Sequence, residues 1–295
     1  MVCTMCPRNC RAERNDETGN GFCKMPSLPV VARANIHNWE EPPISGTRGT
    51  GAVFFSGCNL KCCFCQNDEI SHKNAGMKIS VERLAEIFYE LSEKGVHSID
   101  LVNPTHYADA IIKALNIYKP QIPIIYNTSG YDSVETLKKL EGYIDVYLPD
   151  LKYYSREKSE RYAKCPDYFE KATDAILEMH RQQSENIFND EGILEKGLII
   201  RHLCLPSNVE ESKNILLWIK NNLPEDTLIS LMSQYTPFGR ANQYKEINRR
   251  LMTSEYQKVV DYFFSIGLKN GFMQEKSSAK TEYIPKFDLT GVKKD

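Results

Sequence analysis

Residues 51–67 read Gly-Ala-Val-Phe-Phe-Ser-Gly-Cys-Asn-Leu-Lys-Cys-Cys-Phe-Cys-Gln-Asn, a short apolar run followed at once by a cysteine-rich loop. The run Gly51–Phe55 has the length and the aromatic and aliphatic content of a buried strand. Cys58, Cys62 and Cys65 follow it with the spacing C-x3-C-x2-C. Three thiolates on one short loop can hold three corners of a cubane iron–sulfur cluster and leave the fourth iron open to an outside ligand. The stretch therefore predicts such a cluster at the end of a strand.

A fourth cysteine of this loop, Cys63, is wedged between its neighbours and is expected to point away from the other three. A structural zinc site would normally close with four ligands, which disfavours zinc here. The chain has ten cysteines, and tight clusters in an intracellular, enzyme-sized chain indicate metal or iron–sulfur ligands rather than disulfides. Cys165 and Cys204 stand apart and are expected to be small core residues.

Apolar runs alternate with segments of helical periodicity along the rest of the chain. The expected strands are Gly51–Phe55, His97–Val102, Ile122–Tyr126, Ile144–Leu148, Leu198–Leu205 and Leu228–Met232. The expected helices are Val81–Glu93, Ala108–Tyr118, Ser133–Leu140, Tyr168–Arg181, Val209–Asn221 and Ser254–Ile266. Strands that are apolar throughout and alternate with helices indicate a parallel sheet covered by helices.

Six strand–helix units are fewer than the eight of a complete barrel, so an α/β fold with an open, partial (β/α)6 barrel is expected over residues 49–280. A cysteine-rich extension at 1–48 would precede it, and a docked strap or frayed tail at 281–295 would follow. A doubly wound sheet stays open as an alternative, because periodicity does not choose between the two. In either fold, the chemistry lies at the carboxyl ends of the strands.

Composition excludes several classes of protein. The 295 residues include 37 basic and 39 acidic ones, a formal charge of −2, which argues against a nucleic-acid partner or a polybasic membrane surface. With 41% hydrophobic residues the chain is not disordered. It has no apolar run near the roughly 20 residues that cross a bilayer, and no apolar signal-peptide core at its start. We expect a soluble, cytoplasmic enzyme without a membrane partner.

The loop resembles that of the radical S-adenosylmethionine (SAM) superfamily, including the aromatic Phe64 before the last cysteine. Phe64 would lie beside the adenine of SAM, or would simply anchor the loop. From Gly51 onward the chain looks most like the activating enzymes of glycyl radical enzymes, in the branch of pyruvate formate-lyase activating enzyme-like proteins. The likeness rests on Cys58–Asn67, Asn127–Tyr131, Asp145–Tyr153 and Ile200–Pro206.

The resemblance implies a [4Fe–4S] cluster whose open iron is chelated by the amino and carboxylate groups of SAM. The reduced cluster would donate one electron to the sulfonium, and the resulting 5′-deoxyadenosyl radical would take a hydrogen atom from the substrate. For an activating enzyme, the substrate is a glycine Cα–H of a partner glycyl radical enzyme, and the electron donor is of flavodoxin or ferredoxin type. Modification of a small molecule, a peptide or a nucleic acid is the alternative within this chemistry. An electron-transfer or metal-scaffold protein is the alternative outside it.

Several further residues are assigned by the resemblance to cofactor contacts. Asp150 and Lys152, at the end of the fourth strand, would contact SAM, with Lys152 in a catalytic role, or would form an ordinary ion pair. Arg201, inside the apolar fifth strand, would pair with the methionyl carboxylate or with one of the protein's own acids. Asn127 and Ser129, after the third strand, would hydrogen-bond the cofactor or only build a turn.

The chain departs from the family pattern after the second strand. Many members have Gly-Gly-Glu there, which orients the amino group of SAM, whereas residues 102–107 read Val-Asn-Pro-Thr-His-Tyr. Asn103 and Thr105 can still supply acceptor oxygens. His106 would bind the carboxylate or donate a proton, or would be a hydrogen-bonded structural residue. The departure casts doubt on a plain pyruvate formate-lyase activator.

A second cysteine cluster lies at the N-terminus, where Cys3, Cys6, Cys10 and Cys23 have the spacing C-x2-C-x3-C-x12-C. Such spacing suits zinc or an auxiliary iron–sulfur cluster, and thiolates alone do not decide between them. The segment resembles the Cys-Pro-Arg-x-Cys extension of the same activating-enzyme-like branch, which ordinary short activators lack. It therefore indicates a different or unassigned substrate.

Overall fold

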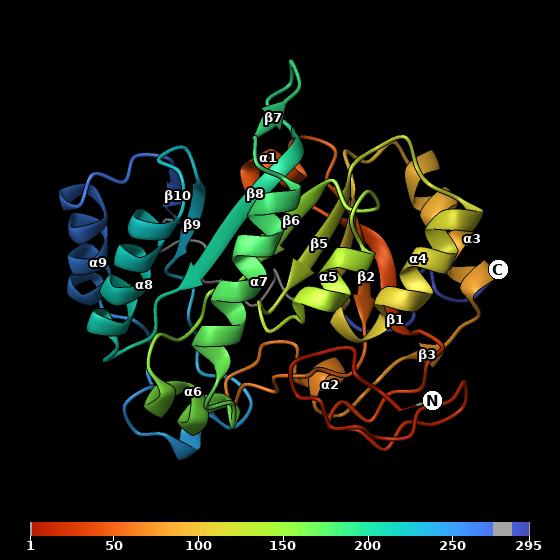
Figure 1. The fold of residues 1–295 in the computed structure, drawn as a ribbon, viewed down its shortest axis with the longest axis horizontal. Helices are drawn as coiled ribbons and strands as arrows, with labels where there is room; N and C mark the ends of the chain where they lie inside the picture. Colours follow the sequence, from red (N-terminus) through yellow and green to blue (C-terminus); the bar gives the residue numbers. More distant parts are fainter. Residues whose placement is uncertain (1, 274–284, 295) are drawn as a thin grey trace.

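The computed structural model describes residues 2–273 and 285–294. Within these ranges a ten-stranded sheet has the order β10-β9-β8-β6-β5-β4-β2-β1-β3, with β7 paired to β8 outside that path. Figure 1 shows the strands side by side, with α5, α7 and α8 lying across them. The two strands at the ends of this order, β10 and β3, do not pair with each other, so the sheet is open.

The six expected parallel strands and six expected helices are all present, and the structure adds a further parallel strand, β10, and a further helix, α6. The parallel strands are β2 (Thr50–Phe55), β4 (Ile99–Val102), β5 (Ile124–Thr128), β6 (Val146–Pro149), β8 (Leu194–Leu203), β9 (Leu228–Met232) and β10 (Gly271–Met273). The helices between them are α3 (Val81–Glu93), α4 (Ala108–Ile117), α5 (Val134–Lys139), α6 (Arg156–Ala163), α7 (Tyr168–Gln182), α8 (Val209–Asn222) and α9 (Thr253–Ser265).

Helix α3 illustrates how local sequence sets these boundaries. The side chain of Ser80 caps its first turn by accepting a hydrogen bond from the backbone N–H of Arg83. Leu84, Phe88 and Leu91 recur at helical spacing and are buried. The amphipathic pattern therefore fixes both where the helix begins and which face packs on the sheet.

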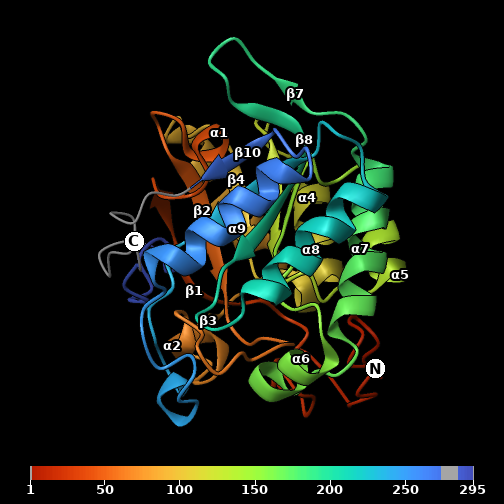
Figure 2. The same ribbon diagram turned by 90° about the vertical axis from the view of Figure 1, so that its left-hand side faces the viewer.

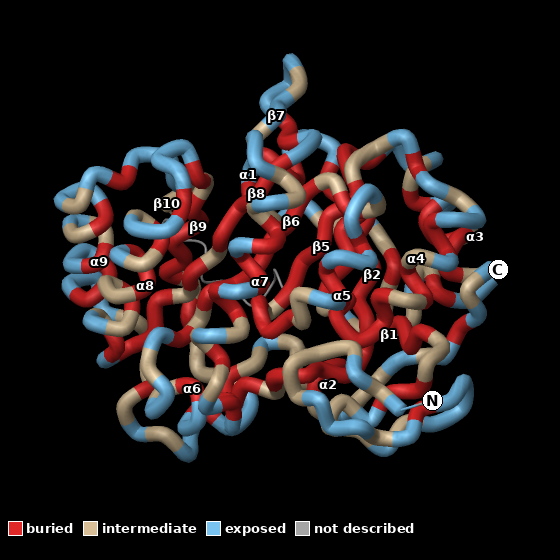
Figure 3. The backbone as a smooth tube through the Cα atoms, viewed as in Figure 1, coloured by how far each residue is buried: buried red, intermediate tan, exposed pale blue. Residues whose placement is uncertain are grey.

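The two faces of the sheet differ in what covers them. Along β4, Ile99 and Leu101 belong to the main core together with the apolar residues of the long helices, whereas Val102 belongs to a separate cluster with Phe54 and Ala52. Residues of α3, α4, α5, α7, α8 and α9 all fall in the main core. Helices that cover one face only, as Figure 2 also shows, fit a partial barrel and not a doubly wound sheet. Figure 3 shows the buried strands inside the exposed outer helices.

Antiparallel strands extend one edge of the sheet. β1 (Val30–His37) pairs with β2, and β3 (Met77–Lys78) pairs with β1. The short helix α1 (Pro42–Ser45) follows β1 and buries Ile44 against the inner face of the sheet. The remaining short elements are α2 (Asp68–Ser71), β7 (Ile187–Phe188) and two 3-10 turns at Thr105–Tyr107 and Ala241–Gln243.

The described end of the chain is docked along β1. The N–H of Leu289 donates to the carbonyl of Ala32, and the N–H of Ala34 donates to the carbonyl of Thr290. The ring of Phe287 packs edge-to-face on Phe54 at 5.6 Å between centroids. Residues 285–294 therefore form a strap, while 281–284 lie outside the described residues.

Candidate active site

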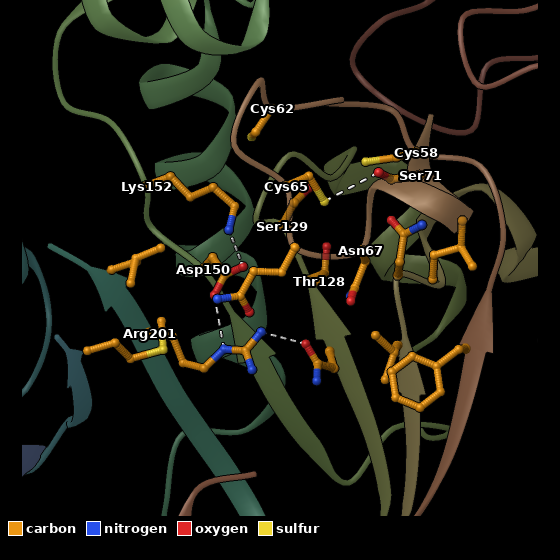
Figure 4. Close-up of a pocket in the computed structure, with 18 of the residues that line it drawn as sticks. Cys58, Cys62, Cys65, Asn67, Ser71, Thr128, Ser129, Asp150, Lys152 and Arg201 are labelled. Atoms are coloured by element: carbon orange, nitrogen blue, oxygen red, sulfur yellow. Dashed lines mark hydrogen bonds and ion pairs between the residues drawn. The ribbon is translucent and has the colours of Figure 1, made fainter. Parts of the chain in front are cut away.

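A cavity of about 280 Å³ opens at the carboxyl ends of the parallel strands. Cys58, Cys62 and Cys65 line it, and Cys63 is not among its lining residues. Figure 4 shows the three cysteines at one end of this cavity, with Lys152 and Asp150 next to them and Arg201 further away. The spacing C-x3-C-x2-C thus places three sulfurs on one wall.

The loop is held in this shape by its backbone. Gly57 has φ +80, and a Cβ atom there would stand 2.2 Å from the side chain of Met25, so no other residue fits without a shift. The N–H of Cys63 donates to the carbonyl of Tyr162 at 2.8 Å, and its carbonyl accepts from Arg240 at 2.7 Å. These bonds tie Cys63 to the outer side of the loop.

Each of the three cavity sulfurs accepts a hydrogen bond. The phenol of Tyr153 donates to Cys62 Sγ at 3.2 Å, and the hydroxyl of Ser71 donates to Cys65 Sγ at 3.3 Å. Cys58 Sγ accepts from the N–H of Leu60 at 3.3 Å. Donors aimed at sulfur stabilise thiolates and tune the metal that they bind.

The donor set fits a cluster better than a single metal ion. Within residues 2–273 and 285–294, no three histidine, cysteine or acidic side chains stand close enough to share one ion. The thiolates of a cubane bind different irons at separate corners, so they stand further apart than the ligands of one zinc ion. Cys58, Cys62 and Cys65 line the cavity and Cys63 does not, which matches the three protein ligands of a cluster with one open iron.

A row of charged side chains runs from the cysteines into the barrel. Lys152 pairs with Asp150, Arg201 Nε donates to Asp150 Oδ1 at 3.0 Å, and Arg201 also bonds Glu40 Oε2 at 3.0 Å. Burial alone would raise the pKa of Asp150, but Arg201 and Lys152 hold it below its usual range. Burial alone would lower the pKa of Lys152, but Asp150 and the Cys62 sulfur raise it. Asp150, Lys152 and Arg201 are therefore charged at neutral pH.

Comparison with known proteins agrees with this geometry. The model of the radical SAM superfamily matches residues 52–198, which include the three cysteines and Lys152. The chain belongs to the radical SAM superfamily. An uncharacterized protein of Methanocaldococcus jannaschii, MJ0674, is 31% identical over 269 residues, which is 88% of this chain and 73% of that protein.

A second sequence relative and one solved structure resemble parts of this radical SAM chain. A 7-carboxy-7-deazaguanine synthase of Methanothermobacter thermautotrophicus is 29% identical over 105 residues, 35% of this chain and 42% of that enzyme. The crystal structure of Streptococcus suis SuiB bound to S-adenosylmethionine aligns with a TM-score of 0.50 at 16% identity, over 74% of this chain. The chain spans about half the length of SuiB, 48%, and the likeness concerns the fold. None of the helices in the described ranges is long and apolar enough to span a membrane.

Arg201 is paired with the protein's own groups. Besides Asp150 and Glu40, its guanidinium donates to Asn127 Oδ1 at 2.6 Å, so three of its five N–H groups have protein acceptors. Of the two alternatives drawn from the sequence, the structure shows the internal ion pair. The side chain of Asn127 is also used within the protein. Its oxygen accepts from Arg201, and its amide N–H donates to Asp100 at 3.2 Å.

Two residues expected at the cofactor are directed elsewhere. His106 is buried, its Nε2 lies 2.7 Å from the carbonyl of Ser56, and burial lowers its pKa to about 3. Thr105 donates to Asp132 Oδ1 at 2.7 Å. Neither is among the residues that line the cavity, because the chain turns into a 3-10 turn after Pro104 and carries both side chains away. Both side chains have protein partners outside the cavity, and their contact with SAM stays a prediction.

The other expected residues do line the cavity. Asn103, at φ +61, donates its amide to the carbonyl of Gly57, which leaves its side-chain oxygen available. The hydroxyl of Ser129 is buried and has no protein partner. Phe64 packs edge-to-face on Tyr235 at 5.6 Å between centroids, so it both borders the cavity and anchors the loop.

The acids Glu40, Glu41 and Asp100 were not expected at the site. Glu40 and Glu41 line the cavity, and Asp100 lies behind Asn127. The sequence around Glu40 and Glu41, Trp-Glu-Glu-Pro-Pro at 39–43, gives no catalytic signal, because it falls in the segment before the first barrel strand. Only the antiparallel pairing of β1 with β2 brings it to the barrel.

The N-terminal cysteines lie beside the cluster loop without forming a closed metal site. Burial raises the pKa of Cys6 to about 12, and Cys3, Cys10 and Cys23 are near enough to influence it. Arg8 fastens the segment to the barrel, since its guanidinium donates to the carbonyl of Asn59 at 2.8 Å. The four sulfurs are gathered in one region but do not converge at the distance of ligands to one ion.

Proposed function

We propose that this radical SAM enzyme holds a [4Fe–4S] cluster on Cys58, Cys62 and Cys65 and binds SAM between that cluster and the Lys152–Asp150 pair. The observation that carries the proposal is the cavity itself, which is lined by three hydrogen-bonded sulfurs and by the Lys152–Asp150 ion pair next to them. When bound, the cluster supplies one electron to the sulfonium of SAM, which releases methionine and a 5′-deoxyadenosyl radical.

The chain's own residues would bind and orient the cofactor. The ammonium of Lys152, near Cys62, attracts a carboxylate placed over the loop. The unpartnered hydroxyl of Ser129 and the side-chain oxygen of Asn103 offer hydrogen bonds to the sugar or the amino group. Phe64 and its aromatic neighbours exclude water from the same wall.

The spin-resonance signal of the reduced cluster tests SAM binding directly. We expect SAM to change that signal in the wild type, because its amino and carboxylate groups would take the open iron. Lys152→Met should weaken the response by tenfold or more in SAM concentration, while Lys171→Met, at the surface, should leave it unchanged. An unchanged signal at saturating SAM would contradict the proposal.

For the substrate we propose a glycyl residue of a partner protein, with a flavodoxin- or ferredoxin-type donor supplying the electron. The support is the resemblance of Asn127–Tyr131, Asp145–Tyr153 and Ile200–Pro206 to activating enzymes. The second candidate is a small molecule, which the partial likeness to a 7-carboxy-7-deazaguanine synthase favours.

Deuterium transfer separates these two substrates. Host cells grown on α-deuterated glycine would be split into a protein fraction and a small-molecule fraction, each incubated with the reduced enzyme and SAM. Deuterium in 5′-deoxyadenosine from the protein fraction alone supports the glycyl substrate. Deuterium from the small-molecule fraction alone, or from neither, contradicts it.

We also propose that the N-terminal cysteines bind a second metal, zinc or iron–sulfur. The support is their spacing and the gathering of Cys3, Cys10 and Cys23 around Cys6. Metal analysis of the purified protein tests it. We expect zinc, or iron beyond four atoms per chain, that is lost in Cys6→Ser but kept in Cys165→Ser.

A further inference from the structure

Carboxylates outnumber cations in the inner part of the cavity. The carboxylates of Glu40, Glu41 and Asp100, which we call the acidic floor, surround the guanidinium of Arg201 together with Asp150. Asp150 is also shared with Lys152. Four carboxyl groups thus face two cations, and the region is short of positive charge.

Two of these carboxyl groups have an oxygen without a partner. Glu41 Oε2 and Asp100 Oδ1 are buried and accept no hydrogen bond from any described residue. Glu41 is 6% exposed and is one of the residues that line the cavity, and the Ser230 hydroxyl, which also has no hydrogen-bond partner, lies beside its carboxyl group. A buried acceptor left unpaired is costly, and a donor brought by a ligand removes that cost.

The acidic floor lies at the other end of the cavity from the cysteines. Glu40 and Glu41 precede α1, next to the amino end of β2, whereas Cys58 follows the carboxyl end of β2. In Figure 1, α1 and the cysteine-side helix α2 accordingly lie at opposite ends of the strands. Three ion pairs in a row connect the floor to Lys152: Glu40 with Arg201, Arg201 with Asp150, and Asp150 with Lys152. Figure 4 shows the last two. A group bound at the floor is therefore separated from the cluster by that ion-paired row.

We propose that the acidic floor is a subsite for a cationic group of the substrate, an ammonium or a guanidinium, with Glu41 as its main acceptor. The inference rests on the proposed function, in which SAM occupies the cysteine end and the substrate enters beside it. The cation donates hydrogen bonds to Glu41 Oε2, and its charge favours the ionised form of this carboxyl group. It would hold the reacting carbon of an amine-bearing small molecule, or of a peptide next to a lysine or arginine, at a fixed depth.

Binding to the cluster-loaded, oxidised enzyme tests this by saturation-transfer NMR. The probes are n-butylammonium and n-butylguanidinium, with n-butanol as the neutral control. Acetyl-Gly-Lys-Gly-amide and acetyl-Gly-Gln-Gly-amide form the peptide arm. We expect the cations to bind and the alcohol not to. Glu41→Gln should weaken cation binding at least tenfold, while Glu178→Gln, a buried glutamate on α7, should not.

The arms also identify the source of the cation. Preference for the lysine peptide over both n-butyl cations indicates a peptide substrate, and the reverse indicates a small amine. Equal binding of cation and alcohol, or cation binding that Glu41→Gln leaves unchanged, overturns the inference. The comparison of cation with alcohol in the wild type remains decisive if the variant does not fold.

SAM affinity distinguishes this inference from the proposed function. If Glu41→Gln lowers the affinity for SAM itself, the floor serves the cofactor's own ammonium and the substrate subsite is wrong. If SAM still perturbs the cluster signal while no cationic probe binds, the proposed function stands and only the subsite fails.

Discussion

The phenol of Tyr153 donates a hydrogen bond to Cys62 Sγ across 3.2 Å, inside a cluster of buried aromatic rings. Tyr153 also packs edge-to-face on Tyr168 at 5.2 Å between centroids, which fixes the direction of its hydroxyl. Tyr153 follows the Asp150–Lys152 pair on the same strand end. One short segment therefore supplies both the ion pair of the cavity and a donor to one of its sulfurs.

Tyr153→Phe is expected to lower the reduction potential of the cluster. Hydrogen bonds to ligand sulfurs stabilise the more negative, reduced state, so losing one favours the oxidised state. The ring and its packing stay in place, so cluster content should not change. Potentiometric titration measures the shift. An unchanged or raised potential would show that this hydroxyl does not act on the cluster.

The three cavity cysteines and Cys63 are expected to differ in iron content after reconstitution. Ala at Cys58, Cys62 or Cys65 removes a cluster ligand and should leave less than a quarter of the wild-type iron and sulfide. Cys63→Ala should keep nearly all of it, since Cys63 faces Tyr162 and Arg240. All four variants are made in a protein whose N-terminal cysteines are replaced by serine, so that iron bound there does not add to the measured iron and sulfide. Equal loss in Cys63→Ala would contradict the assignment.

Arg201→Met is expected to lower the free energy of unfolding by about 3–5 kcal/mol, because it leaves buried carboxylates without their cation. Glu40 and Asp150 both lose a partner. Arg161→Met, which breaks an ion pair whose arginine is 45% exposed, should cost far less because solvent screens exposed pairs. Urea denaturation of the metal-free proteins gives both values. A loss below 1 kcal/mol for Arg201→Met would mean that the internal network is not structural.

Glu41 is expected to make stability fall as pH rises. Burial raises its folded pKa to about 7, with Arg201 opposing the shift and Glu40 adding to it. The unfolded pKa of Glu41 is near 4.5. Between pH 4.5 and pH 7 the unfolded chain has therefore released a proton that the folded protein keeps, and the free energy of unfolding falls as the pH rises. Above pH 7 the loss is complete, on the order of 3 kcal/mol.

The measurement is urea denaturation at pH 5 and pH 8 for the wild type and Glu41→Gln. The groups that face Glu41 are Glu40 from its own segment, Asp100 from β4, Arg201 and Ser230 from β8 and β9, and all are kept in the variant. The variant should lose that part of the pH dependence. A wild type and a variant with the same slope would show that Glu41 ionises normally.

The sequence predicts the parallel core of this fold well, because its strands and helices carry strong local periodicity. Val81–Glu93 is observed as predicted, and the predicted strand Gly51–Phe55 begins one residue earlier, at Thr50. The expected partial barrel of the α/β class is confirmed. The radical SAM superfamily, too, could be recognised from the cysteine spacing alone.

The inner half of the site could not be predicted. Glu40 and Glu41 reach Arg201 through the antiparallel pairing of β1 with β2, a long-range contact with no local signal. His106 follows a strand end, as a cavity residue would, yet the turn after Asn103 directs it to the carbonyl of Ser56. Position at a strand end therefore identifies candidates, but side-chain direction depends on turns and partners that the pattern does not encode.

The most direct test of the central claim is the amount of 5′-deoxyadenosine formed under anaerobic conditions. The reconstituted protein would be incubated with dithionite and SAM beside the Cys58→Ala/Cys62→Ala/Cys65→Ala variant, and the product quantified by chromatography. We predict formation by the wild type and by Cys63→Ala, and none above background by the triple variant. Equal product from wild type and triple variant, or none from a fully loaded wild type supplied with host extract as the substrate source, would contradict the account.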